Sequence, residues 1–127
     1  IKKIIKTPFN LVDSGNLHLC IPKKSVAKFD LNDLYNKLAL HIKPIGINVS
    51  IYSKDKNNFN IRTYENGVGE TLSCGSASFS VACLCLKDKI KKVTIKSSGG
   101  RLQFKRIEGS ILMSGPTKFV YSGSFDG

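Results

Sequence analysis

The sequence predicts a single α+β domain in which a mixed or mostly antiparallel sheet wraps around a central helix. Short segments rich in β-branched and aromatic residues alternate with Gly, Pro or Asn, which is typical of strands. Two other segments are compatible with helices. The chain has 127 residues, 41% of them hydrophobic, and no repeat, linker or low-complexity block, so one packed core is expected over residues 1–127.

The predicted strands are short, as in "KVTIKS" and "RLQFKRI". In chain order they are expected at 17–21, 47–53, 59–65, 92–97, 101–107, 110–115 and 118–125.

The segment "DLNDLYNKLALHI", residues 30–42, predicts the first helix. Its apolar side chains recur at helical spacing, at Leu31, Leu34, Tyr35, Leu38, Ala39 and Ile42. Asp30 is a suitable N-cap, because its carboxylate can accept a hydrogen bond from a first-turn N–H group. Asp33 places negative charge in the first turn, where the helix dipole favours it.

A second helix is expected to start at Cys74 or Gly75 and to continue to about Lys87. One of its sides would be buried, through Phe79, Ala82, Cys83 and Leu86. Cys83 and Cys85 are expected to be core or helix-face thiols, because an unpaired buried cysteine behaves as a small hydrophobic side chain.

The net charge of +11 is of the kind that suits nucleic acid or an acidic membrane surface. The cations are nearly all lysines spread along the chain, however, and no cluster interleaves them with aromatic groups that could stack on bases. Neither nucleic acid nor a membrane is therefore an expected partner. A basic nucleic-acid-binding module stays open as an alternative, which steeply salt-dependent affinity would identify.

No apolar run approaches the roughly 18 residues of a membrane span, and "IKKIIKTPFN" lacks the features of a signal peptide. A cytoplasmic protein is expected. The four cysteines show no metal-ligand spacing, and this much aliphatic sequence makes a disulfide framework unnecessary. The chain begins with Ile1 inside a basic, β-branched stretch, which suggests part of a longer protein.

Cys74 stands where strand-like sequence gives way to the second helix, in "ETLSCGSASFSVACLC". Unpaired N–H groups and the helix dipole stabilise negative charge at a helix N-terminus, so a thiolate is favoured there. The small residues Gly75, Ser76 and Ala77 let a ligand approach the backbone, and the same N–H groups could hold a carboxylate. A capped helix with an incidental cysteine is the competing interpretation.

The segment "RTYENGVGETLSCGSAS", residues 62–78, closely resembles the second cysteine motif of diaminopimelate epimerase. The resemblance is most specific at Gly67, Gly69, Glu70, Thr71, Cys74 and Gly75. Further segments resemble that family in the same order along the chain: "VDSGNLHLC" (12–20), "PIGINVSIY" (44–52), "SSGGRLQF" and "LMSGPTKFVYSG". Together they extend the resemblance over almost the whole chain.

The resemblance implies two pseudo-symmetric halves, each a sheet around a central helix, with the active site between them. This chain resembles the C-terminal half, and the N-terminal half is absent from it. The implied reaction uses neither a cofactor nor a metal. One cysteine from each half flanks the α-carbon, one removing the α-proton as a thiolate and the other donating a proton as a thiol. Cys20 is a poor substitute for the second thiol, because it does not open a glycine-rich helix.

The resemblance also implies the roles of particular residues. Cys74 would be catalytic, with His18 and Glu65 supporting the acid–base chemistry. The substrate contacts would be Asn16, Asn48, Glu65, Asn66, Gly75 and Ser76. Three of these residues have plainer interpretations: Asn16 as a turn residue, His18 as a structural histidine and Glu65 as a solvated strand end. The implied partners are an amino-acid substrate and the N-terminal half, with a homodimer left open.

Asn66 is the main departure from the family, which typically has Arg at that position. A guanidinium grips a carboxylate with two charged hydrogen bonds, and an amide cannot. An amino-acid racemase of related fold with another side-chain preference therefore stays open. Leu17 in place of Pro, and Ser76-Ala77 in place of Thr-Gly, are milder changes. The phenazine-biosynthesis-like isomerases share the fold but generally lack the cysteine, so Cys74 argues against them.

Overall fold

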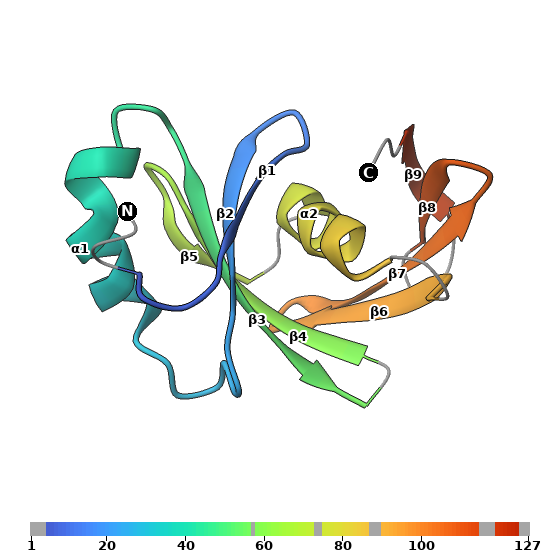
Figure 1. Cartoon of the computed structure of the whole chain (residues 1–127), viewed down its shortest axis with the longest axis horizontal. Helices are drawn as coiled ribbons and strands as arrows, with labels where there is room; N and C mark the ends of the chain where they lie inside the picture. Colours follow the sequence, from blue (N-terminus) through green and yellow to red (C-terminus); the bar gives the residue numbers. More distant parts are fainter. Residues whose placement is uncertain (1–4, 57, 73–74, 87–89, 115–118, 125–127) are drawn as a thin grey trace.

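The computed structural model describes residues 5–56, 58–72, 75–86, 90–114 and 119–124. Nine strands and two helices lie in this part of the chain (Figure 1). The helices are α1 (Leu31–Ile42) and α2 (Gly75–Cys85). The strands are β1 (Asn10–Asp13), β2 (Leu17–Pro22), β3 (Asn48–Asp55), β4 (Asn58–Glu65), β5 (Gly69–Thr71), β6 (Lys92–Ser97), β7 (Gly100–Ile107), β8 (Ser110–Ser114) and β9 (Phe119–Ser124).

The strands form one mixed sheet in the order β1-β2-β3-β4-β6-β7-β8-β9, with β5 paired to β4. Two neighbouring pairs, β2–β3 and β4–β6, are parallel, and the other pairs are antiparallel. The sheet curls around α2, whereas α1 lies on the opposite side of β2, β3 and β4 (Figure 1). The predicted α+β fold with a mixed sheet around a central helix is confirmed.

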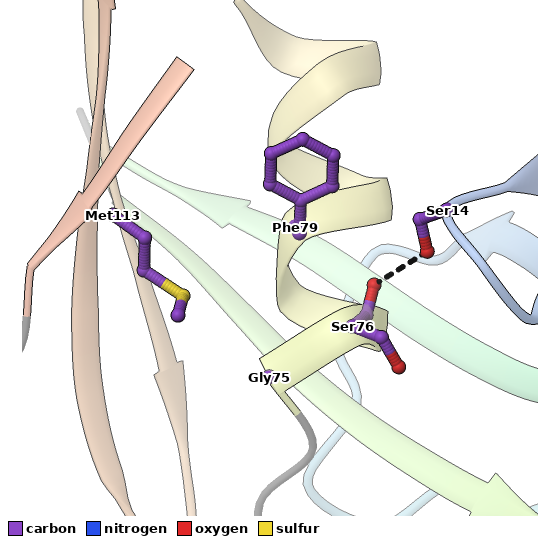
Figure 2. Close-up of a pocket in the computed structure, with 5 residues that line it drawn as sticks. All are labelled: Ser14, Gly75, Ser76, Phe79 and Met113. Carbon is purple, nitrogen blue, oxygen red and sulfur yellow. Dashed lines mark hydrogen bonds between the residues drawn. The ribbon is translucent and has the colours of Figure 1, made fainter. Parts of the chain in front are cut away.

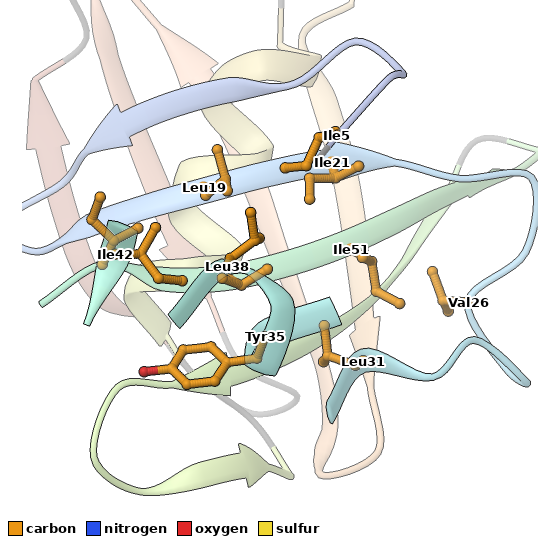
Figure 3. Packing of buried hydrophobic residues seen from close by; sticks show 11 residues of the cluster. Ile5, Leu19, Ile21, Val26, Leu31, Tyr35, Leu38, Ile42 and Ile51 are labelled. Carbon is orange, nitrogen blue, oxygen red and sulfur yellow. The ribbon is translucent and has the colours of Figure 1, made fainter. Parts of the chain in front are cut away.

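Each face of the sheet has its own hydrophobic cluster. The cluster under α1 combines side chains of that helix with alternate residues of β2 and β3, as Figure 3 shows for Leu38, Leu19 and Ile51. The other cluster surrounds α2 and includes the fully buried Phe104 of β7 and Ile111 of β8. Strand side chains alternate between the two faces, so β2 and β3 contribute to both clusters.

Helix α1 forms as the sequence predicts. The Asp30 carboxylate accepts a hydrogen bond from the backbone N–H of Asp33 at 2.9 Å, which confirms the N-cap. The apolar stripe is buried through Leu31, Tyr35, Leu38 and Ile42.

Helix α2 corrects the predicted one-sided burial. Six consecutive residues, 77–82, are buried, so this part of the helix has no exposed side. The physical reason is the curl of the sheet, since α2 contacts β2, β3, β6 and β7 and small Ala and Ser side chains allow this close approach. Cys83 is only partly buried, and the helix ends at Cys85. Lys87 lies outside the described residues.

Two strands, β1 and β5, were not predicted. Both are short, and β5 consists only of "GET", whose composition is not typical of a strand. Their partners β2 and β4 hold them in the sheet. Neither described helix is long and apolar enough to cross a membrane.

Candidate functional site

Sheet pairing brings four of the predicted site residues to one end of the molecule. The parallel β2–β3 register places His18 opposite Asn48. In the antiparallel β3–β4 pair, the end of β4 lies beside the start of β3. Glu65, the last residue of β4, and Asn66, which follows it, therefore lie near Asn48. The three segments that carry these residues are far apart in sequence, and the pairing of β2, β3 and β4 brings them together.

His18 connects this end of the sheet to the first turn of α2. Its side chain is fully buried, and Nε2 lies 3.1 Å from the Ser76 hydroxyl oxygen. Burial lowers the pKa of His18, and the negative charge of Glu65 opposes this shift. Nδ1 is buried and has no hydrogen-bond partner among the described residues. The surroundings of His18 therefore favour the neutral imidazole.

Two further hydroxyl groups hold the first turn of α2 in place. The Ser14 Oγ lies 3.2 Å from the Ser76 carbonyl oxygen and 2.8 Å from the Ser80 Oγ, which itself lies 2.8 Å from that carbonyl. Ser14 belongs to the β1–β2 turn, so this cluster fixes the turn against the helix (Figure 2). The sequence did not single out Ser14 or Ser80, although a polar residue in an apolar helix needs a partner.

Asn16 lies at the end of the same turn. The Asp13 carboxylate accepts a hydrogen bond from the Gly15 N–H at 3.0 Å, and the φ of +98° at Gly15 is one that residues with a side chain rarely adopt. Asn16 follows with an exposed side chain. The turn thus presents Asn16 beside β2, two residues before His18.

Asn48 and Asn66 are bonded to one another. The Asn48 Oδ1 accepts a hydrogen bond from the Asn66 backbone N–H at 2.8 Å. The Asn66 Oδ1 accepts a hydrogen bond from the Tyr35 hydroxyl at 2.5 Å. The sequence predicted Tyr35 only as a core residue, but a buried phenol usually requires a hydrogen-bond partner, and that requirement was the available signal.

A small pocket opens beside the N-terminus of α2. Its volume is about 240 Å³, and it is lined by Ser14, Gly75, Ser76, Phe79 and Met113 (Figure 2). Gly75 and Ser76 are the first two residues of the helix. The pocket therefore places a cavity next to a helix pole that favours anions. No group of three or more potential metal-ligating side chains occurs among the described residues.

Cys74 lies outside the described residues, immediately before Gly75. We expect it to react faster with a small thiol reagent than the other three cysteines. Burial raises the pKa of Cys20 to about 12 and that of Cys83 to about 11, so both are expected to stay protonated and slow. Mass spectrometry of the native protein after timed modification measures all four rates. The expectation is wrong if Cys74 reacts no faster than Cys83 and Cys85.

The buried imidazole predicts a pH-dependent stability. Below about pH 6.5 the unfolded chain binds a proton at His18, but the folded chain resists protonation because its pKa is lowered. The free energy of unfolding should therefore fall as the pH falls from about 6.5 towards the folded pKa, by up to about 1.4 kcal/mol per pH unit. Urea denaturation at pH 7.5 and 5.5 measures this difference. His18→Gln should reduce it, and the exposed His41→Gln is the control; equal pH dependence in both variants would contradict the prediction.

Arg62 proves to be engaged within the fold. Its guanidinium binds both carboxylate oxygens of Glu70 at 2.7 Å and donates to the carbonyl oxygens of Val26 and Phe29 at 2.6 and 2.7 Å. Arg62 does lie on the same face of β4 as Tyr64. These interactions join β4 and β5 to the loop before α1, so the guanidinium of Arg62 is already engaged by four hydrogen bonds within the fold.

Removing this ion pair should lower stability measurably. Side-chain exposure is 21% for Arg62 and 36% for Glu70, so water weakens the pair and a coupling of about 1 kcal/mol is expected. Arg62→Met alone should cost more than Glu70→Gln, because it also leaves two carbonyl groups without their donor. A double-mutant cycle in urea measures the coupling. Equal costs for the two single variants would show that the carbonyl contacts contribute nothing.

The curated proteins described below, which match this chain by sequence, share one name. No protein-family model matches the chain. The diaminopimelate epimerase of Methanocella arvoryzae is 34% identical over 91% of this chain, and that of Buchnera aphidicola from Baizongia pistaciae is 34% identical over 98%. The Acinetobacter baumannii enzyme of the same name is 30% identical over 92%. The chain spans 43–45% of the length of these curated relatives.

Solved structures support the fold. A PhzC/PhzF phenazine-biosynthesis protein from Clostridium difficile aligns with a TM-score of 0.59 at 20% identity, over 77% of this chain and 37% of that one. A predicted epimerase from Pseudomonas aeruginosa aligns with a TM-score of 0.55 at 14% identity, over 87% and 39%. At these identities the likeness concerns the fold alone. The sequence matches show that the chain is homologous to the diaminopimelate epimerases, over less than half of their length.

Proposed function

We propose that this chain supplies one half of the active site of a cofactor-independent amino-acid epimerase. Diaminopimelate, the substrate named for its relatives, is the first substrate to test, with conversion of the LL form to the meso form. The isomerase reaction would need a second half, corresponding to the part of the relatives that this chain does not span. Residues 1–127 would then form one domain of a two-domain enzyme.

The chemistry is a proton exchange at the α-carbon. A thiolate on one face takes the α-proton, so the C–H bond breaks and an S–H bond forms. A thiol on the other face gives its proton to the carbanion, which forms the new C–H bond and leaves a thiolate. Cys74 would be one of these groups, and the second half would supply the other. The substrate loses one proton and gains one proton, and nothing is oxidised or reduced.

The N-terminus of α2 would carry the α-carboxylate. Backbone N–H groups of Gly75 and Ser76 are suited to hold this anion, and they stabilise the charge that develops beside it as the carbanion forms. Asn16 at the β1–β2 turn, and Asn48 and Asn66 at the sheet end, would contact the remainder of the substrate. His18 and Glu65 would support proton transfer.

The observation that carries this proposal is the meeting of His18, Asn48, Glu65 and the α2 N-terminus in a homologue of the epimerases. The Nε2 atom of His18 is hydrogen-bonded to the Ser76 hydroxyl, and the negative charge of Glu65 raises the His18 pKa against the larger, opposite effect of burial. These two interactions connect three of the proposed residues. Perturbed titrating groups beside a pocket are typical of functional sites.

A hybrid enzyme tests the proposal. In it this chain replaces the matched segment of the Buchnera aphidicola relative, so the relative supplies the second half. We expect the hybrid to form meso-diaminopimelate from the LL isomer, and in D₂O to place deuterium at the α-carbon. The unaltered relative is the control. A folded hybrid that catalyses no exchange, beside an active control, would contradict the proposal.

A further inference from the structure

We propose that a polar groove on the α1 side of the sheet binds the phosphate group of a small phosphorylated molecule. The groove lies between the loop before α1 and the strands β3, β4 and β6. No described residue assigned above to the epimerase site lines it, so this inference does not depend on the proposed function. It is carried by a gap in the sheet, a row of polar side chains and two uncompensated cations.

The groove opens where strand β4 changes partners. Along one edge, β4 pairs with β6 through residues 58–60 and with β5 through residues 63–65. Ile61 and Arg62 lie between these pairings and line the groove, as does Ser25 of the loop before α1. The groove has a volume of about 630 Å³, within the range of about 300–1,000 Å³ that is typical of small-molecule sites.

A row of polar side chains crosses four strands at the groove. Ser53 of β3 is paired with Asn60 of β4, and Asn60 with Lys96 of β6. These three residues line the groove. Lys96 is paired in turn with Arg101 of β7. Paired residues point to the same face of a sheet and neighbouring strands lie about 4.8 Å apart, so this row of hydrogen-bond donors spans about 14 Å.

Two hydroxyl groups at the groove lack partners. Ser53 is 6% exposed, and its side chain makes no hydrogen bond to any described residue. A small recess shares Ser97 and Ser98 with the groove. Its lining includes Thr71, whose Oγ1 is buried and has no partner in the described part of the chain. A buried hydroxyl without a partner costs free energy, so both groups are suited to a ligand that brings acceptor oxygens.

Two cations of the row are uncompensated. Lys96 and Arg101 lie directly opposite each other on β6 and β7, an arrangement in which like charges destabilise the strand pair. Neither has an ion-pair partner among the described residues. Asp55, on the same face of β3, lies beyond Ser53 at the end of the row farthest from these cations. An anion bound beside Lys96 would replace this repulsion by attraction.

The arrangement suits a phosphate group better than a carboxylate. A phosphate monoester carries a charge of about −1.5 to −2 at pH 7 and three strong acceptor oxygens. Side-chain donors line the groove from β3, β4 and β6, so they can bond separate oxygens. A carboxylate is bound best by a guanidinium fork, and the guanidinium of Arg62 in this lining already binds Glu70.

A titration of the 127-residue chain with glycerol 3-phosphate tests the proposal, and glycerol is the matched compound without the phosphate. The backbone N–H signals of Ser53, Asn60 and Lys96 are followed by NMR at constant ionic strength. We expect glycerol 3-phosphate to shift them saturably, with a Kd of about 1 mM or lower, and glycerol to leave them unchanged. Shifts that do not saturate, or no shifts at all, would overturn the inference.

Lys96→Gln removes the cation that lines the groove, and Lys92→Gln is its matched control. Lys92 lies on the same face of β6 and also faces a cation, Lys105 of β7, but it does not line the groove. Lys96→Gln should raise the Kd about tenfold, because a charge-assisted hydrogen bond is lost, and Lys92→Gln by less than about twofold. Equal losses would show that the whole basic face attracts polyanions such as nucleic acid, and the groove would not be the site.

Ser53→Ala tests the unpartnered hydroxyl group. Because this hydroxyl bonds no described residue, its loss should leave the urea midpoint unchanged or higher, while the Kd for glycerol 3-phosphate rises about threefold. Ser50→Ala is the control in the same strand. It removes a hydroxyl 2.9 Å from the Thr63 Oγ1, so it should lower the midpoint and leave the Kd unchanged. An unchanged Kd in Ser53→Ala would contradict the proposed row of donors.

Discussion

Replacing Cys74 with serine is expected to lower the epimerase rate of the hybrid enzyme by about a thousandfold or more. General acid–base catalysis by one positioned group contributes about 10² to 10⁴ in rate, and a serine hydroxyl is far too weakly acidic to serve as the base. The helix N-terminus can favour a thiolate near neutral pH, but it cannot bring an alcohol into that range. Deuterium exchange at the α-carbon of LL-diaminopimelate measures the loss.

Cys83→Ser is the matched control for this variant. It makes the same atomic change in α2, just over two turns from Gly75, at a partly buried position. Its rate should stay within about twofold of the unaltered hybrid, because substitutions away from a site rarely alter catalysis strongly. If Cys74→Ser keeps a tenth or more of the activity, Cys74 is not the acid–base group.

The sequence predicted the elements that depend on local patterns. Helix α1 has a capping Asp30 and an apolar stripe of its own, and both features act within a dozen residues. The burial of α2 depended instead on strands that come before and after it in the chain. The burial of residues 77–82 on all sides arises only when the sheet curls around the helix, which no periodicity within residues 75–85 could predict.

The site shows the same division between local and tertiary information. The resemblance to an enzyme family singled out His18, Asn48 and Asn66, and the sheet places them close together. Their partners could not be predicted, because the bond of Tyr35 to Asn66 spans 31 residues and that of His18 to Ser76 spans 58. Such pairs depend on how α1 and α2 pack against opposite faces of the sheet.

Arg62 illustrates the limit of strand alternation as a guide to function. Strand alternation places Arg62 on the same face as Tyr64, several ångströms back along the strand, which makes it a weak candidate for binding the distal carboxylate of a substrate. The three residues of β5 then bring Glu70 beside it, and the loop before α1 supplies two carbonyl groups. A neighbour from an unpredicted strand therefore decides what this cation binds.

The isolated 127-residue chain is expected to convert no LL-diaminopimelate to the meso form, because inversion requires an acid and a base on opposite faces of a planar carbanion. Cys74 can serve only one face. Cys20 cannot serve the other, since it is fully buried and its pKa is raised to about 12. Chiral chromatography after long incubation measures the product. Turnover by the chain alone would contradict the two-half arrangement, and a rate that rises with the square of protein concentration would then assign the second thiol to another copy of the chain.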